Sequence, residues 1–564
     1  FLAFEIGRGP DGRWRVLSDR ADAPSGAGFA LETRVAATHV LPGFHRHAHV
    51  HRLAGFFRDF RDALDALRGE GSRVGILTPG ALTDTYYEQA YIARYLGMPL
   101  LEGGDLAVED GRPGIRTVRG LVPVDVLWRR MDGAWSDPLE LRAHSRIGTP
   151  GLVQAVRAGR ATMVNALGAG VLETQALMAF LPAVAERLLG EPLRLPNVAT
   201  WWCGDAGARS HVRAEAGSMT VGPALDLRLP FETGARHAVA GEMRGGGPEG
   251  DPGRPDRDVD DWIEAEAAGL VGKEIVTLST TPVWEGDRLR PRPMTLRVFL
   301  ARTPGGWAVM PGGFGRVGGG TGLGAVAMQE GGRAADVWVL SERPTEPVSL
   351  LATSEAPFAR GAPVALPSRA GDNLFWAGRY VERTEGLVRL HRAWHSRQAD
   401  GADVALLGCL GGVLGQYGIE AGRAVPEGLE GALGSAVRSA GAVRDRFSVD
   451  GWAALKDLQK TLGRMAGTAR PGLDAALAMS VMLRKLSGFS GLVHENMVRA
   501  EGWQFLSLGR SLERAAMMTE VLIALADPGA PPGALDAAVE IGDSVMTHRQ
   551  RYAVGTTRDT VVDL

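Results

Sequence analysis

VGILTPGALTDTYYEQAYIARYLGMPLLEGGDLAV, residues 74–108, is the stretch that decides the fold of the first half of the chain. Its opening residues form a short apolar run that Pro79 and Gly80 end, as these residue types commonly end strands. Residues 86–97 then place apolar side chains at helical spacing, and residues 98–108 return to a strand-like pattern. The order strand, helix, strand predicts a βαβ unit within an α/β or α+β domain.

Further strand-like segments lie downstream of this stretch, at residues 124–130, 294–301 and 307–313. Residues 341–367 follow with several prolines and little periodicity, which is typical of a linker between domains. We therefore predict that residues 1–340 form one α/β module and that 341–367 connect it to a second domain.

The second half has a different pattern. Residues 373–394 and 505–526 carry apolar side chains at three- and four-residue spacing, with few strand signals. Residues 368–564 are therefore predicted to form an all-α helical bundle.

Composition narrows the function classes. The chain has 564 residues and a formal net charge of −3, so it is long enough for large cores and has no global field that would gather nucleic acid or anionic membrane. Two cysteines, Cys203 and Cys409, are too few for a disulfide framework, which favours the cytoplasm. No signal peptide or membrane-spanning run is expected. Because Phe1 is not a methionine, we expect the chain to be an internal fragment.

The predicted bundle contains an internal repeat. GRYVER at residues 378–383 and GRSLER at 509–514 share the form GRx[VL]ER in similar amphipathic surroundings. In each copy two arginines and one glutamate share a helix face. Ion pairs between two helices are the favoured interpretation, and a phosphate or carboxylate site made by arginine forks is the alternative.

Several longer motifs resemble the circularly permuted type 2 ATP-grasp proteins. They are LTPGALTDTYYEQAYIARYLGMPLLEGGDL (77–106), WRRMDGAWSDPLEL (128–141), NALGAGVLETQALMAFLP (165–182) and LPNVATWWCGD (195–205), followed in family order by LSTTPVW (278–284), LRVF (296–299), MPGGFGRV (310–317) and MQEGGRAADVWVL (328–340). The second half resembles the alpha-E domain, through SRAGDNLFWAGRYVERTEGLVRL (368–390), VRDRFSVDGW (443–452), GFSGLVHENMVRAEGWQFLSLGRSLERA (488–515) and DSVMTHRQRY (543–552). The resemblance thus covers nearly the whole chain.

The resemblance implies an ATP- and Mg²⁺-dependent ligase that joins a carboxylate to an amine through an acyl phosphate. It also implies a peptide or amino-acid-like substrate, and protein partners are a possible role for the helical domain. Carried onto this sequence, the family pattern assigns phosphate and catalytic roles to Arg297 and Arg316, with Glu274 and Arg297 at the nucleotide. It assigns the substrate or metal end to Arg129, Arg130, Asp132, Glu102 and Asp105. The metal ligands themselves stay unassigned.

The sequence departs from the family at other positions. Gly222 stands where a phosphate-binding cation is usual, and Gln175 stands where many relatives have lysine. Further losses fall at Thr295, Ala327, Ala334 and Ala335. These departures favour a second hypothesis, a catalytically inactive scaffold that binds a peptide or protein. A lysine or arginine such as Lys273 or Arg333, if it filled the space left at Gly222, would restore the ligase hypothesis.

Four weaker patterns have ordinary structural explanations. The alternating histidines 45, 47, 49 and 51 favour a solvated basic face over a metal site, and Trp201, Trp202 and Cys203 favour a core cluster over a substrate wall. The glycines 313, 315 and 318 match GxGxxG, but no amphipathic helix follows, so a turn or a phosphate-covering loop is preferred to a Rossmann site. His494, Glu495 and Asn496 favour a buried hydrogen-bond network over a ligand site that would include Asn496 and Arg499.

Overall fold

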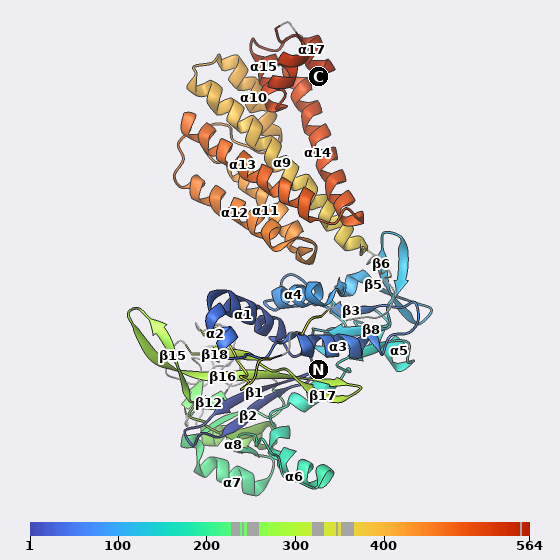
Figure 1. Cartoon of the computed structure of the whole chain (residues 1–564), viewed down its shortest axis with the longest axis vertical. Helices are drawn as coiled ribbons and strands as arrows, with labels where there is room; N and C mark the ends of the chain where they lie inside the picture. The colour runs from blue at the N-terminus through green and yellow to red at the C-terminus, as the bar shows by residue number, and fades with distance from the viewer. Residues whose placement is uncertain are drawn as a thin grey trace. The chain divides into compact units, whose positions relative to one another are not determined.

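The computed structural model divides into two compact units (Figure 1). The first comprises residues 1–115 and 121–362, and the second comprises residues 116–120 and 363–564. The structure describes residues 1–226, 237–239, 242–244, 259–318, 332–345, 348–350, 366–552 and 555–564. Most of the predicted linker and the glycine-rich stretch before residue 332, including Ala327, lie outside these ranges. The α/β module followed by an all-α region confirms the predicted fold class.

An antiparallel sheet in the order β19-β18-β16-β1-β2 forms the centre of the first unit, and β15 and β17 also pair with β16. The long β16 is amphipathic because its side chains from Met294 to Ala301 are alternately partly exposed and buried in the core. The strands are β1 (Leu2–Arg8), β2 (Trp14–Arg20), β15 (Thr280–Glu285), β16 (Arg288–Thr303), β17 (Gly306–Val309), β18 (Phe314–Val317) and β19 (Arg333–Asp336).

The predicted βαβ unit is present in a parallel sheet ordered β4-β3-β8-β9. Its apolar core contains Phe1, Phe60 and Trp128, with the Phe1 ring centroid 5.1 Å from that of Phe60 and 5.3 Å from that of Trp128. Its elements and their neighbours are α1 (Ala27–Val40), α2 (Pro42–His47), α3 (Ala54–Asp65), β3 (Val74–Leu77), α4 (Tyr86–Leu96), β4 (Leu100–Leu101), η1 (Gly103–Asp105), β5 (Leu106–Glu109), β6 (Arg112–Thr117), β7 (Gly120–Pro123), β8 (Val126–Arg129), η2 (Gly133–Trp135), α5 (Leu152–Arg157) and β9 (Thr162–Val164).

A third sheet of the first unit is antiparallel, in the order β10-β14-β11-β12-β13. Helix α7 and helix α8 pack their apolar faces on it around Val212, Trp262 and the buried Cys203. Its elements are η3 (Ala169–Glu173), α6 (Leu177–Leu189), β10 (Thr200–Trp202), α7 (Ala206–Ala214), η4 (Ala216–Ser218), β11 (Met219–Pro223), β12 (His237–Val239), β13 (Glu242–Arg244), α8 (Val259–Glu266), η5 (Ala267–Gly269) and β14 (Leu270–Glu274).

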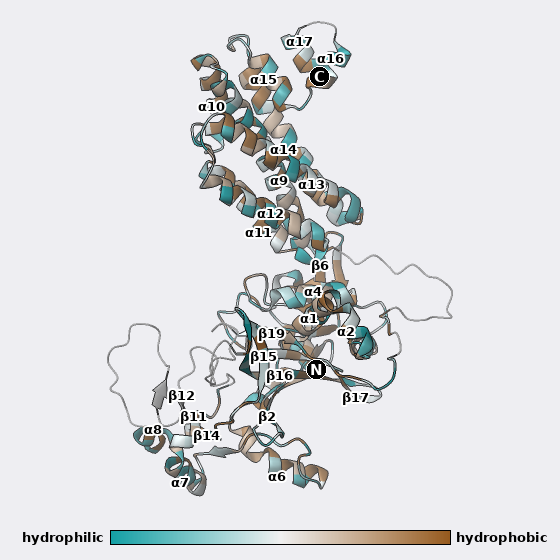
Figure 2. Cartoon of the chain, turned by 60° about the vertical axis from the view of Figure 1, so that its left-hand side comes forward, coloured by the Kyte–Doolittle hydropathy of each residue, from teal (hydrophilic) through white to brown (hydrophobic). Residues whose placement is uncertain are grey.

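The second unit is a helical bundle built on the long helix α9, which contacts α10, α11, α13, α14 and α15. Figure 2 shows apolar and polar residues alternating along these helices, as expected of amphipathic helices around one core. The helices are α9 (Ser368–Ala399), α10 (Val404–Gln416), α11 (Glu427–Gly441), η8 (Arg444–Arg446), α12 (Val449–Ala466), α13 (Leu473–Asn496), α14 (Glu501–Leu525), α15 (Ala534–Ile541), α16 (Val545–Arg551) and α17 (Arg558–Asp563).

The GRx[VL]ER repeat joins α9 to α14 through reciprocal ion pairs. Glu513 accepts hydrogen bonds from Arg379 and Arg383 of the other helix. Glu382 in turn accepts hydrogen bonds from Arg510, at 3.0 Å, and from Arg514. The ion-pair interpretation is therefore confirmed, and both glutamates are buried.

The repeat's glycines explain how the two helices come so close. A Cβ at Gly378 would lie 2.1 Å from the Leu506 carbonyl oxygen, and a Cβ at Gly509 would lie 2.1 Å from that of Phe375. No side chain fits at such a distance, so the backbones touch at both glycines. This contact fixes the register that brings arginines and glutamates together.

The sequence analysis predicts no membrane-spanning segment, but helix α13 is long and apolar enough to cross a membrane when only length and composition are considered. In the structure it packs against α9 and α12, and Met479, Met482 and Leu486 are buried in the bundle core. A core helix accounts for its composition.

Burial bears on three of the weaker sequence patterns. His45 and His47 lie on the short, exposed helix α2, and the described residues contain no group of three or more metal-ligating side chains. Cys203 is buried, and burial raises the pKa of its thiol to about 11, which does not suit a nucleophile. The buried network predicted at His494, Glu495 and Asn496 is wrong, because these residues are exposed at the end of α13.

Candidate functional site

The candidate site of the first unit centres on the loop of residues 21–26, which joins β2 to α1. Its main-chain groups bond to side chains supplied by β16, α4, η3 and the end of β8. Buried main-chain groups need such partners because water does not reach them. Charged side chains from four separate elements therefore converge on one short loop.

Glu5 of β1 lies opposite Arg297 of β16 in the paired strands. The Arg297 Nε donates to Glu5 Oε2 at 2.9 Å, and Thr295 Oγ1 donates to Oε1 at 2.6 Å. Burial alone would raise the pKa of Glu5, but Arg297 and the nearby Arg316 outweigh it and lower the pKa to about 2. Arg297 also donates to the Ser25 carbonyl at 3.1 Å. The predicted catalytic Arg297 is thus fixed in a buried ion pair.

Arg316 of β18 belongs to the same cluster and is more exposed than Arg297. Its Nε lies 4.0 Å from Glu5 Oε1, and 14% of its side chain is exposed, compared with 4% for Arg297. Of the two arginines assigned to phosphate, Arg316 is therefore the more accessible to a ligand.

Arg129 forms a two-pronged ion pair with Asp22 of the central loop. Its Nη2 lies 2.7 Å from Asp22 Oδ1, and its Nη1 lies 3.1 Å from Oδ2. The Gly133 amide donates to the same carboxylate at 3.0 Å. Arg129 is completely buried. This predicted substrate residue therefore holds the loop in place.

Arg130 has donors to spare. Its Nη2 bonds to the Pro24 carbonyl and lies 3.6 Å from Glu88. Its Nε and Nη1 are buried and have no hydrogen-bond partner among the described residues. The guanidinium carbon lies 4.9 Å from the centre of the Trp128 ring. Buried donors without partners are uncommon, and a carboxylate oxygen would satisfy one of them.

Two carboxylates that the sequence analysis did not single out hold the loop's amides. Glu88 accepts from Gly26 at 2.7 Å and from Gly28 at 3.0 Å. Glu173 accepts from Ala21 at 2.6 Å and from the next amide at 2.5 Å. Both glutamates lie inside motifs quoted above, but their partners are distant in sequence. Only the fold connects them.

The remaining predicted residues lie elsewhere. Asp132 is exposed and caps η2 by accepting from the Ala134 amide at 2.8 Å. Glu102 and Asp105 cap η1 reciprocally. The Glu274 side chain is exposed at the end of β14, and its amide donates to the Ala199 carbonyl at 3.0 Å. The structure does not bring these four residues into the cluster around residues 21–26.

Lys273 of β14 lies on the same side of its sheet as Gly222. In the ladder with β11, Lys273 lies opposite Thr220 and Val271 lies opposite Gly222. Residues two apart on a strand face the same side, so the lysine projects from the face on which Gly222 lacks a side chain. It is the sole lysine in residues 1–455, where arginine supplies every other long cationic side chain.

The surroundings of Lys273 leave its charge poorly compensated. Its Nζ bonds to the Gln175 Oε1 and lies 3.3 Å from the Leu17 carbonyl. Burial lowers the pKa of Lys273 to about 7, with Asp19 opposing the shift. Burial disfavours the charged form of Asp19 as well, and therefore raises the pKa of Asp19 to about 6. An amine and a carboxyl that both titrate near neutral pH are typical of functional sites.

Several residues that depart from the family pattern lie on regular strands of the first unit. Gly222 lies on β11, and Ala334 and Ala335 lie on β19, opposite Arg316 and Gly315. Thr295 bonds to Glu5, as described above. Arg333, the other candidate replacement for the missing cation, is exposed on β19, with its Nη2 3.7 Å from Glu285. Of the two candidates, only Lys273 belongs to the sheet that contains Gly222.

Magnesium at a nucleotide site needs fewer protein ligands than a metal ion that only stabilises a fold. At nucleotide sites it is commonly held by one or two carboxylates together with phosphate oxygens. The described residues contain no group of three or more His, Cys, Asp or Glu side chains that would hold a metal by themselves. Asp19, half-buried and electrostatically coupled to Lys273, fits the lesser requirement.

Comparison with known proteins supports the assignment of both units. Residues 1–318 match the sequence model of the circularly permuted ATP-grasp type 2 family, and residues 366–564 match Alpha-E, a predicted alpha-helical domain with a conserved ER motif. Within the matched range, the sequence Glu-Arg occurs at residues 382–383 and 513–514, in the two repeats described above.

Relatives with similar sequences include an uncharacterized protein of Mycobacterium tuberculosis strain H37Rv, 31% identical over 97% of this chain and 65% of its own length. A second uncharacterized protein of that strain is 31% identical over 59% of the chain and 58% of its own length. An uncharacterized Synechocystis protein is 29% identical over 58% of the chain and 66% of its own length. The chain thus spans slightly less than two thirds of the first relative. With its sheets, its central loop and its matched residues 1–318, the chain belongs to the circularly permuted ATP-grasp type 2 family, and an Alpha-E domain follows.

Proposed function

We propose that the first unit binds ATP and joins a carboxylate to an amine. The burial of Lys273 near Gly222 is the observation that supports this proposal most strongly. Lys273 is a buried amine on the sheet face where Gly222 leaves the family's usual cation missing, and burial lowers its pKa to about 7. A lysine of this kind regains full charge when an anionic phosphate arrives. It therefore suits a site that fills with a nucleotide.

In the proposed reaction the substrate carboxylate takes the terminal phosphoryl group of ATP, which releases ADP and gives an acyl phosphate. An amine then attacks the acyl carbon, and phosphate leaves with the electrons of the broken C–O bond. Positioning and charge neutralisation are the protein's main contributions to such chemistry. Magnesium, when bound, supplies further neutralisation of the phosphates.

The chain's own residues divide these tasks. Lys273 and Arg316 bind phosphate, and Arg130, whose Nη1 has no partner, receives the substrate carboxylate. Asp19, electrostatically coupled to Lys273, is the carboxylate that would hold Mg²⁺. Glu5, Arg297, Asp22 and Arg129 keep the loop of residues 21–26 in position. The family resemblance favours a peptide or amino-acid-like substrate.

A scaffold that binds a peptide without catalysis is the second candidate. It is favoured by one observation, the buried ion pairs that join Arg297 to Glu5 and Arg129 to Asp22. A side chain locked in this way supports the architecture of a site whether or not chemistry occurs there. Turnover separates the two candidates.

ADP release distinguishes them directly. The full chain with Mg·ATP is incubated with mixtures of amino acids and short peptides, and ADP is followed by a coupled assay. The ligase proposal expects release that depends on both a carboxylate and an amine and that falls at least a hundredfold in Lys273→Met. Lys485→Met, which alters a half-buried lysine paired with Asp457 in the second unit, is the matched control. Nucleotide binding without release under every mixture would favour the scaffold.

A further inference from the structure

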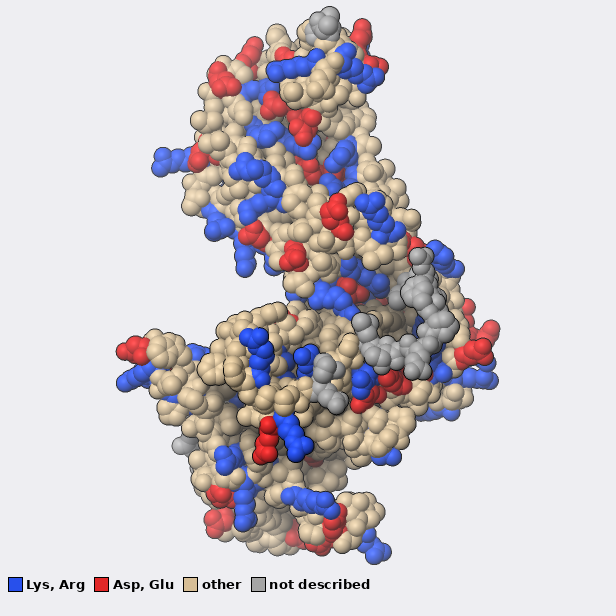
Figure 3. Space-filling view, in the orientation of Figure 1, with Lys and Arg blue, Asp and Glu red and all other residues tan. Residues whose placement is uncertain are grey.

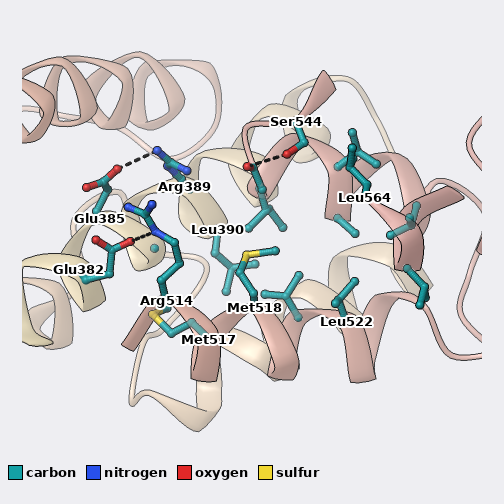
Figure 4. Close-up of a pocket in the computed structure, with 18 residues that line it drawn as sticks. Glu382, Glu385, Arg389, Leu390, Arg514, Met517, Met518, Leu522, Ser544 and Leu564 are labelled. Carbon is teal, nitrogen blue, oxygen red and sulfur yellow. Dashed lines mark hydrogen bonds and ion pairs between the residues drawn. The ribbon is translucent and has the colours of Figure 1, made fainter. Parts of the chain in front are cut away.

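The helical unit contains a cavity of about 340 Å³ that plays no part in the chemistry proposed above. Four helices, α9, α14, α15 and α17, line it, and it is open to solvent on one side. Its size is within the range of small-molecule sites. Figure 4 shows charged side chains gathered at one end and apolar side chains along the rest. The cavity is therefore amphipathic along its length.

The charged end carries a surplus of positive charge. Arg389 and Arg514 line the cavity with the buried Glu382 and Glu385, and Arg510, which does not line it, pairs with both carboxylates. The nearest further carboxylate is that of Asp543, 3.7 Å from Arg389, but 78% of its side chain is exposed, so water screens it. This end of the cavity therefore favours an anionic ligand.

Two of these arginines also have donors available. Arg389 bonds to Glu385 through Nη2 at 2.7 Å, and Arg514 bonds to Glu382 through Nε. Their other guanidinium N–H groups make no hydrogen bond to the described residues. Both arginines line the cavity, and Figure 4 places their guanidinium groups at the same end. A carboxylate bound there would accept charge-assisted hydrogen bonds without breaking the existing pairs.

The apolar part is lined by side chains that adapt to a chain-like ligand. Met517 and Met518 of α14 face it together with Leu390 and Leu522. Methionine is unbranched and flexible, so it fits irregular or variable apolar shapes. The opposite wall comes from α15 and α17, through Ala538, Val539, Ile541, Val561 and Val562.

We infer that this cavity binds a carboxylate that carries an unbranched apolar chain. The carboxylate lies between Arg389 and Arg514, and the chain runs past Met518 toward α15 and α17. The positive surplus selects the anionic head, and the apolar walls select the tail. The cavity is thus an acyl-chain site of the Alpha-E domain, independent of the nucleotide site of the first unit.

Decanoate is the probe. Its binding to the full chain is measured by isothermal titration calorimetry, below its micelle concentration, alongside octanoate, hexanoate and decanol. We expect one site per chain. Affinity should fall roughly fourfold for each methylene removed, because each buried methylene contributes about 0.8 kcal/mol. Decanol, which lacks the charge, should bind at least tenfold more weakly than decanoate.

Variants test the two ends separately. Arg389→Gln should weaken decanoate binding at least tenfold, whereas Arg397→Gln should leave it unchanged. Arg397 is on the same helix and pairs with Glu540, away from the cavity. Met518→Trp should block the tail, and Ala538→Leu, a smaller filling of the same space, should weaken binding if the larger variant fails to fold.

Two results would overturn the inference. One is the absence of saturable heat with decanoate in a folded chain. The other is binding whose affinity is the same in Arg389→Gln, Ala538→Leu and the unaltered protein, which would place the amphiphile elsewhere on the surface.

Discussion

Glu382 of α9 and Glu513 of α14 occupy equivalent positions in the bundle, and each accepts hydrogen bonds from the two arginines of the other helix's repeat. The glycine that begins each repeat lies against the backbone of the opposite helix, three residues before the partner glycine. In this chain the two GRx[VL]ER repeats therefore form a reciprocal helix clamp. Its charges and its close backbone contact depend on each other.

The glycines of the clamp should tolerate no side chain. Gly378→Ala and Gly509→Ala each place a Cβ 2.1 Å from a carbonyl oxygen, so the helices must separate. We expect each variant to lose about 3 kcal/mol or more of unfolding free energy in urea denaturation. Gly408→Ala on α10, which has open space around its Cβ, is the control and should be neutral or up to about 1 kcal/mol stabilising. Equal tolerance at all three glycines would contradict the clamp.

The buried carboxylates should matter far more than a surface pair. Glu513→Gln leaves Arg379 and Arg383 without their anion, and we expect a loss of about 3 kcal/mol. Glu540→Gln removes a more exposed partner of Arg397 and should cost less than about 1 kcal/mol. Thermal unfolding followed by circular dichroism compares them. If the two substitutions cost the same, the paired motif is not a structural clamp.

The helical unit should lose stability in mild acid because of His391. Burial, with a contribution from His395, lowers the pKa of His391 to about 4. The unfolded chain binds a proton near pH 6.5 while the folded chain does not, so unfolding free energy falls as the pH drops from about 6.5 to 4. The expected loss is about 3 kcal/mol.

Substitution identifies the group responsible for this acid sensitivity. His391→Gln should reduce the slope over this pH window, and the remainder comes from His395, whose pKa burial also lowers. The carbonyl of Ala424 and the ring of His395 face the same imidazole, and neither carries a negative charge that would offset its protonation. An unchanged slope in the variant would assign the acid sensitivity to another group.

Glu5 should protect the first unit at lower pH. Its pKa is about 2, below the ordinary value of 4.5, because Arg297 and Arg316 outweigh the effect of burial. The stability from this ionised carboxylate is fully present above pH 4.5 and is lost as the pH falls toward 2. Glu5→Gln should destabilise the unit at pH 7 and shrink its loss of stability between pH 4.5 and 2. Denaturation curves at fixed pH values measure both effects.

Local pattern predicted much of the fold. The strand, helix and strand expected in residues 74–108 are β3, α4 and β4, and the helical spacing of residues 373–394 lies within α9. The two matching repeats were enough to predict ion pairs between α9 and α14, because spacing places their charges on one face of each helix.

The candidate site was harder to foresee, because its contacts join distant residues. Glu5 and Arg297 are 292 residues apart, and Arg129 and Asp22 are 107 apart. The sequence marked the arginines but gave no sign of which carboxylates would neutralise them. One feature of the sequence did point to the site: Lys273 is the sole lysine in residues 1–455, where the other long cationic side chains are arginines. Burial, which moves its pKa, emerges only from the folded sheets.

The central claim, that Lys273 binds the phosphates of a nucleotide, is tested most directly by calorimetric titration of Mg·ATP into the full chain. The account predicts saturable binding that Lys273→Met weakens at least thirtyfold, that Lys485→Met leaves unchanged, and that takes up protons near pH 7.5 as Lys273 becomes charged. Equal Mg·ATP affinity in Lys273→Met and the unaltered protein, or no binding at millimolar nucleotide by the folded chain, would contradict it.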